Sequence, residues 1–84
     1  MRSSSQSLDL LVSLSKLGFE TVKIEPTIYC RLRKKGKELT VEFCLGDYCV
    51  GIFDENLNLI QPKTKCQTPQ AVLIAVKALS EVYL

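Results

Sequence analysis

Apolar residues recur at every second position between Phe19 and Gln61, which is the spacing of β-strands that bury one face. Short polar segments that contain glycine divide this stretch and predict turns between successive strands. Sequential strands joined by short turns pair with one another in antiparallel fashion. The alternation therefore predicts an antiparallel meander with one apolar face, which the rest of the chain must cover.

The first predicted hairpin has its tip at Lys35-Gly36, so that the numbers of paired residues sum to 71. In this register each apolar residue opposes another, as Leu32 opposes Leu39. Pro26 cannot donate a backbone hydrogen bond to a sheet, so pairing is expected to begin near Thr27.

The second predicted hairpin turns at Gly46-Asp47, with glycine in the first central position of a type II′ turn. Paired residue numbers then sum to 93, which places Leu45 opposite Tyr48. We expect a short fourth strand over Leu57–Ile60 and a loop over residues 62–67.

Helical spacing of apolar residues predicts a first helix over Ser7–Leu17 and a second from Pro69 to about Tyr83, capped by Thr68. We expect residues 1–6 to form a flexible serine-rich tail and residues 7–84 to form a single α+β domain. Its predicted order is α-β-β-β-(β)-α, in two layers. Two helices pack on one face of a three- or four-stranded antiparallel meander sheet.

The chain has four cysteines. The 93-sum register places Cys44 opposite Cys49, and two readings stay open: a cross-strand disulfide or two reduced thiols. Cys30 points into the apolar face, and Cys66 lies in the expected loop, as an ordinary or a reactive thiol. Because there is no C-x2-C spacing and no histidine, and because Cys30 points away from the others, we expect no metal site.

Catalysis is not expected, because the chain lacks histidine and shows no nucleophile–base pair and no glycine-rich phosphate loop. We therefore predict a non-catalytic protein without a cofactor. The N-terminal apolar run is interrupted by polar residues, and the longest apolar run, residues 71–76, is too short to span a bilayer. We expect an intracellular, cytoplasmic protein without a membrane contact.

Basic residues are clustered, although the whole chain has 11 Lys+Arg against 9 Asp+Glu. Basic residues beside a helix start are what phosphate contacts need, so nucleic-acid binding (RNA or DNA) is the leading hypothesis. Lysine-rich turns on an ordinary solvated surface are the alternative. The expected nucleic-acid-binding residues are Arg31, Arg33, Lys34, Lys35, Lys37, Lys63 and Lys65.

The sheet face without helices carries Tyr29 and Phe53. Aromatic side chains beside arginines can stack on bases, but Glu38 and Glu42 on the same face would repel a nucleic acid. For this face we prefer a protein partner or a homo-oligomer, because small domains often associate through an uncovered sheet face.

The chain resembles the double-stranded-RNA-binding domain in three features: the order of its elements, a basic turn between the first two strands, and lysines before the last helix. That resemblance implies contacts to duplex RNA near the turn at residues 34–37 and near Lys63 and Lys65. The lysine-rich helix start of that family is replaced here by residues 68–71, Thr-Pro-Gln-Ala.

The stretch from Leu10 to Val41 also resembles HicA-type toxins, whose catalytic histidine has no counterpart in this chain.

Overall fold

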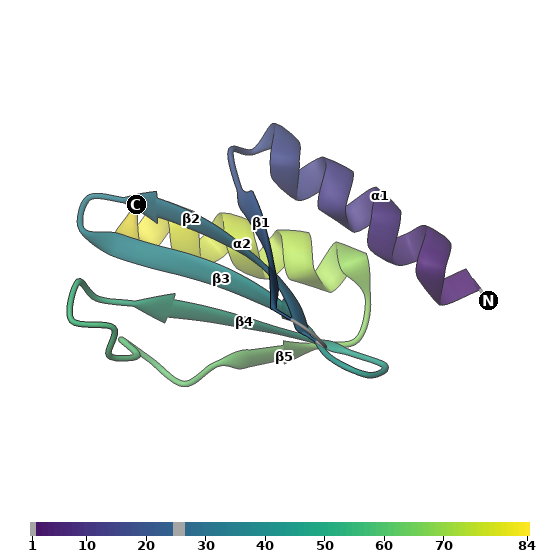
Figure 1. Ribbon diagram of the computed structural model, residues 1–84. Helices are drawn as coiled ribbons and strands as arrows, with labels where there is room; N and C mark the ends of the chain where they lie inside the picture. Colours follow the sequence, from purple (N-terminus) through teal and green to yellow (C-terminus); the bar gives the residue numbers. More distant parts are fainter. Residues whose placement is uncertain (1, 25–26) are drawn as a thin grey trace.

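The computed structural model describes the backbone of residues 2–24 and 27–84 and the side chains of residues 8–24 and 27–84. Two helices flank a five-stranded antiparallel sheet whose strands follow one another in chain order, β1-β2-β3-β4-β5 (Figure 1). The α+β class is confirmed, with more strands than the three or four expected. The elements are α1 (Arg2–Lys16), β1 (Glu20–Ile24), β2 (Thr27–Lys34), β3 (Lys37–Phe43), β4 (Tyr48–Phe53), β5 (Thr64–Cys66) and α2 (Pro69–Tyr83).

The sheet gains one strand at each edge relative to the sequence prediction. Strand β1 precedes Pro26 and pairs with β2, so pairing extends beyond the expected start at Thr27. The expected fourth strand over Leu57–Ile60 is wrong, because this segment makes only an isolated bridge through Leu59. Its backbone cannot run straight: Leu57 has a φ of 65°, and the Asp54 carboxylate accepts the backbone N–H groups of Asn56 and Asn58.

Strand β5 instead lies within the segment that we expected to be a loop. It pairs with β4, with Tyr48 opposite Cys66 and Cys49 opposite Lys65. A segment of three residues is too short for its alternation to stand out in the sequence.

The β2–β3 hairpin has the predicted register, with Leu32 opposite Leu39. Lys35 and Gly36 both have positive φ angles, 55° and 74°, as the two central residues of a type I′ turn require. The right-handed twist of this turn matches that of the strands beside it, which is why the pattern predicted the tip correctly.

The β3–β4 hairpin differs from its predicted register by two residues. Phe43 pairs with Tyr48, so Leu45 lies in the turn, where it is fully exposed (103%). Gly46, with a φ of +84°, is the second central residue of the turn Leu45-Gly46 and not the first of Gly46-Asp47. A shift by two residues leaves the strand side chains on their predicted faces, so the inward residues are those expected, except that Leu45 leaves the core.

Both helices contribute to one core with the inward side chains of the sheet. Helix α2 lies behind the sheet in Figure 1 and packs on β3, β4 and β5, whereas α1 packs against α2 and β1. The predicted start of α2 is confirmed, since the Thr68 hydroxyl accepts the Ala71 N–H at 3.1 Å and Pro69 follows the cap. The fully buried side chains are Leu10, Leu14, Cys30, Leu39, Val41, Val50, Ile52, Val72 and Val76.

Helix α1 begins at Arg2, so its backbone includes most of the segment expected as a tail, and the mobility of residues 1–6 stays a prediction. Within the described part of the chain, neither helix has the length and apolarity needed to cross a membrane.

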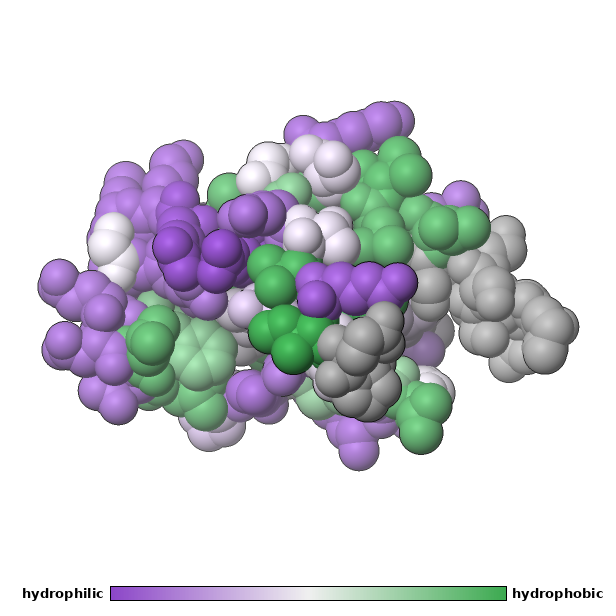
Figure 2. Space-filling model, viewed as in Figure 1, coloured by the Kyte–Doolittle hydropathy of each residue, from purple (hydrophilic) through white to green (hydrophobic). Residues whose placement is uncertain are grey.

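The other side of the sheet, hereafter the open face, carries no helix. Figure 2 shows hydrophilic and hydrophobic side chains interspersed on the surface that includes this side. By register, its central residues are Tyr29, Arg31 and Arg33 of β2, Glu38, Thr40 and Glu42 of β3, Cys49, Gly51 and Phe53 of β4, and Lys65 of β5.

Candidate functional sites

The two arginines among the expected phosphate-binding residues lie on the open face and form ion pairs. The Nε of Arg31 lies 3.2 Å from Oε1 of Glu20, and this contact raises the pKa of the guanidinium. The Nε of Arg33 donates to Oε1 of Glu38 at 2.6 Å. Both cations therefore already face a carboxylate across a strand pair.

Lys63 and Lys65 lie on or beside β5, rather than in a loop before α2. The Nζ of Lys63 donates to Oε1 of Glu42 at 2.7 Å, and the Nζ of Lys65 lies 3.4 Å from Oδ2 of Asp47. Four of the seven expected basic residues are thus partnered by carboxylates.

The remaining three, Lys34, Lys35 and Lys37, lie at the β2–β3 turn. Among the residues that the structure describes, none of them has a carboxylate partner. This turn and Lys65 lie at opposite ends of the sheet (Figure 1), separated by the seven residues of β3 or about 20 Å. The structure does not bring the seven basic residues into one patch.

Two lysines from the helices join the turn lysines instead. Three lysines border a cavity of about 730 Å³ between the two helices and β2: Lys16 at the end of α1, Lys34 of β2 and Lys77 of α2. Lys34 also borders a second cavity, of about 470 Å³, together with Lys35 and Lys37. We call these five lysines the lysine end, and within the described structure none has an acidic partner.

Sequence reasoning missed Lys16 and Lys77, because they lie in two helices about 60 residues apart in the chain. Each is the only lysine of its helix, so neither contributes to a charge cluster in the sequence. The acidic residues that line these cavities are Glu81 at the first and Glu38, Asp54 and Glu55 at the second, and Glu38 is paired with Arg33.

A shallow hollow of about 240 Å³ lies on the open face, between Tyr29 and Phe53. Thr40 also lines this hollow and is only 5% exposed. Its hydroxyl oxygen is buried and has no hydrogen-bond partner among the described residues. The structure therefore places the two expected aromatic contact residues around an unsatisfied polar group.

The side chain of Lys63 contacts two residues that line this hollow, Glu42 and Phe53. A Cβ atom added to Gly51 would lie 3.3 Å from Cγ of Lys63, so the lysine stem occupies the space that a side chain at Gly51 would need. The Nζ lies 5.9 Å from the ring centroid of Phe53, within the range of a cation–π contact.

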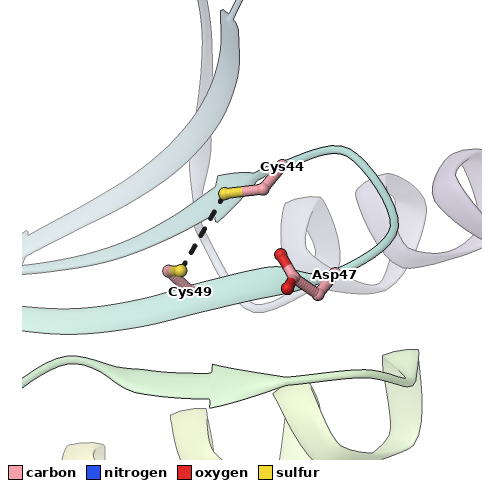
Figure 3. Close-up of side chains that lie close together, drawn as sticks. All are labelled: Cys44, Asp47 and Cys49. Atoms are coloured by element: carbon pink, nitrogen blue, oxygen red, sulfur yellow. Dashed lines mark hydrogen bonds between the residues drawn. The ribbon is translucent and has the colours of Figure 1, made fainter.

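The four cysteines are free thiols. Cys44 is opposite Asp47 and not Cys49, because Cys49 pairs with Glu42. Figure 3 shows that the two sulfur atoms nevertheless point toward each other, and the Cys44 thiol donates to Sγ of Cys49 at 3.9 Å. The two side chains belong to different residue pairs and approach each other diagonally across the strands. The two thiols are in contact but are not joined by a disulfide bond.

Partial desolvation and neighbouring groups both raise the pKa of the Cys44 thiol. Desolvation raises its pKa, the contact with Cys49 raises it further, and the negative charges of Asp47 and Glu42 act in the same direction. The carboxylate of Asp47 belongs to the same cluster: its oxygen and the two sulfur atoms all lie within 4.8 Å of one another. Sequence reasoning missed Asp47, because it considered only cysteine and histidine as ligands.

The other two cysteines are buried. Cys30 is a core residue, as predicted, and burial raises its pKa against the opposing effect of its contact with Thr21. Cys66 ends β5 and is buried, so the expectation of a loop cysteine is wrong. Burial raises its pKa as well, which is the reverse of what a reactive thiol at a helix start requires.

The sequence matches no family model, and searches of curated proteins and of solved structures also found no match.

Proposed function

We propose that this protein is a small non-catalytic binding module that contacts the phosphate backbone of a nucleic acid through its lysine end. One observation carries the proposal: three lysines of a turn and two of the helices gather at one end of the molecule, and none of them has an acidic partner among the described residues. Unpaired lysines release condensed counterions when they neutralise phosphates, which gives affinity without sequence readout.

The proposal narrows the surface expected from the sequence. Lys34, Lys35 and Lys37 keep their role, and Lys16 and Lys77 join them. Arg31, Arg33, Lys63 and Lys65 are assigned to the open face, because each would have to leave a carboxylate before it could bind a phosphate.

The thiol chemistry supports a non-catalytic role. Nucleophilic cysteines need a lowered pKa or an adjacent base. The neighbours of Cys44 raise its pKa, and burial raises the pKa of Cys30 and Cys66.

The test is fluorescence anisotropy of labelled duplex and single-stranded RNA and DNA, at about 50 and 200 mM salt. Five phosphate contacts predict that the affinity falls about 500-fold over this range. Charge reversal in Lys35→Glu and Lys37→Glu should weaken binding and reduce the salt dependence.

Lys65→Glu is the matched control, because it reverses the charge of an exposed lysine at the opposite end of the sheet. We expect it to change the affinity no more than about twofold. The proposal is wrong if no nucleic acid binds at the lower salt concentration, or if Lys65→Glu weakens binding as much as Lys35→Glu.

A second candidate function is self-association through the open face, and the hollow at Thr40 favours it. A buried hydroxyl without a partner is costly, and a group from another chain can satisfy it. The surrounding charges form four ion pairs, two of them between neighbouring strands, which suits an interface that is complementary to itself.

Sedimentation over a range of protein concentrations tests this candidate. The double variant Tyr29→Ala with Phe53→Ala should convert dimers into monomers, whereas Lys35→Glu should leave the dimer intact. A protein that is monomeric at every concentration would exclude self-association through this face.

A further inference from the structure

The hairpin between β3 and β4 brings three potential metal ligands to one side of the sheet. By register, Cys44 lies opposite Asp47. This pair is two positions beyond the pair of Cys49 and Glu42, and its side chains are therefore on the same face. The Cys44 N–H donates to the Asp47 carbonyl oxygen at 3.0 Å, which holds the two strand ends together around the turn. Figure 3 shows the three side chains arranged around a common space beside the hairpin.

The separation of the two sulfur atoms suits a tetrahedral metal ion. Zinc binds thiolates at about 2.3 Å, so two sulfur ligands of a tetrahedral zinc ion lie about 3.8 Å apart. Sγ of Cys44 and Sγ of Cys49 are 3.9 Å apart in the structure. The spacing of Cys44 and Asp47 across Leu45-Gly46 is also the short spacing, two residues between ligands, that is common in zinc sites.

The charges of the cluster also suit a cation. The Asp47 carboxylate oxygen lies within 4.8 Å of both sulfur atoms, so its negative charge would attract a divalent ion held between the ligands. Lys65 contacts Oδ2 of Asp47 at 3.4 Å, and no other described side chain pairs with this carboxylate. Lys65 is exposed and the contact is long, so a metal ion can compete with this ion pair.

From this geometry we infer that Cys44, Cys49 and Asp47 form a binding site for one zinc ion, with water in the fourth position. Two S–H bonds break on binding, two Zn–S bonds form, and the two protons pass to the buffer; the Asp47 carboxylate binds without losing a proton. Cys44 is exposed and the other two ligands are half-buried, so the fourth position faces solvent. The site is at the end of the sheet opposite the lysine end and does not depend on nucleic-acid binding.

The test is a Co²⁺ titration of the full chain, reduced with a reagent that contains no thiol, followed by competition with Zn²⁺. A thiolate–cobalt charge-transfer band should saturate at one ion per chain, and Zn²⁺ should abolish it. In weakly buffered solution, each bound zinc ion should release two protons. Loss of an outer-shell partner already weakens metal binding 10–100-fold, so Cys44→Ser, Cys49→Ser and Asp47→Asn should each weaken it about 100-fold or more.

Two matched variants separate this site from adventitious binding. Cys66→Ala removes a thiol outside the cluster, and Glu55→Gln removes another exposed turn carboxylate. Both should keep the affinity and the spectrum, with circular dichroism verifying that each variant is folded. The inference is wrong if no charge-transfer band forms, if Cys66→Ala abolishes it as Cys44→Ser does, or if one ion binds per two chains.

Discussion

Lys63 reaches across the open face to Glu42, with Nζ 2.7 Å from Oε1, while its stem covers Gly51. The two residues are 21 positions apart in the chain, and the contact joins the segment before β5 to the last residue but one of β3. A lysine that the sequence suggests for phosphate binding thus covers the one glycine of the β4 strand.

The Lys63–Glu42 ion pair should contribute little to stability. Both side chains are about one-third exposed, and exposed pairs contribute about 0.2–1 kcal/mol. A double-mutant cycle with Lys63→Met and Glu42→Gln, measured by urea unfolding, should give a coupling free energy in this range. The coupling should shrink at high salt, and a value that does not depend on salt would mean that packing dominates the contact.

Replacing Thr40 by valine should stabilise the isolated chain. The hydroxyl is buried without a partner, and an unsatisfied buried polar group costs about 1–3 kcal/mol. Valine has nearly the same shape and no polar atom, so the free energy of unfolding of Thr40→Val should rise by about 1 kcal/mol. Thr64→Val, at an exposed position of β5, is the control and should change it by less than about 0.5 kcal/mol.

The same substitution tests the second candidate function. If the open face mediates self-association through the Thr40 hydroxyl, Thr40→Val should weaken the dimer while it stabilises the monomer. A variant that is less stable than the wild type as a monomer would show that the hydroxyl has a partner in solution.

The register of the β3–β4 hairpin predicts very different effects at two leucines. Leu39 is fully buried, so Leu39→Ala should lower the free energy of unfolding by about 2–5 kcal/mol. Leu45 is fully exposed in the turn, so Leu45→Ala should change it by less than about 0.5 kcal/mol. A large loss in Leu45→Ala would instead support the register that pairs Leu45 with Tyr48.

The free energy of unfolding should fall as the pH rises past about 8.5, where the thiols of the unfolded chain ionise. Burial raises the pKa of Cys30 in the folded state, so the unfolded chain loses its proton first. Proton loss from the unfolded state favours unfolding, and stability therefore decreases from the unfolded-state pKa up to the folded-state pKa. The slope contributed by one thiol is at most about 1.4 kcal/mol per pH unit.

Urea unfolding between about pH 8 and pH 10 measures this slope. Cys30→Ala provides the comparison, because it removes the thiol from both states and should flatten the profile while it lowers stability at every pH. If wild type and variant have parallel profiles, Cys30 does not cause the dependence.

Several features could be predicted because local physics determines them. Lys35-Gly36 sets the first hairpin through its turn geometry, and Thr68-Pro69 starts α2 through a cap and a fixed φ. The inward position of Cys30 follows from strict alternation, which leaves only one face of β2 for the core. Each prediction depends on residues within one turn or one strand pair.

The edges of the sheet could not be predicted in this way. Strand β5 has three residues, and what makes it a strand is the free edge of β4. The β3–β4 register was ambiguous by two residues, because both alignments place the side chains of the two strands on the same faces and differ in whether Leu45 lies in the sheet or in the turn. The backbone hydrogen bond between Cys44 and Asp47 belongs to the alignment that the structure adopts.

By itself, the sequence determined the α+β class, the buried face of the central strands and the placement of Cys44 and Cys49 on the face away from the helices. Only the tertiary structure decided which charges are neutralised and which ligands meet. Lys65 pairs with Asp47 across two strands, whereas Lys16 and Lys77 gather near Lys34 from separate helices. The reason is physical: alternation depends on neighbours along the chain, but electrostatic and ligand contacts depend on distances that chain packing sets.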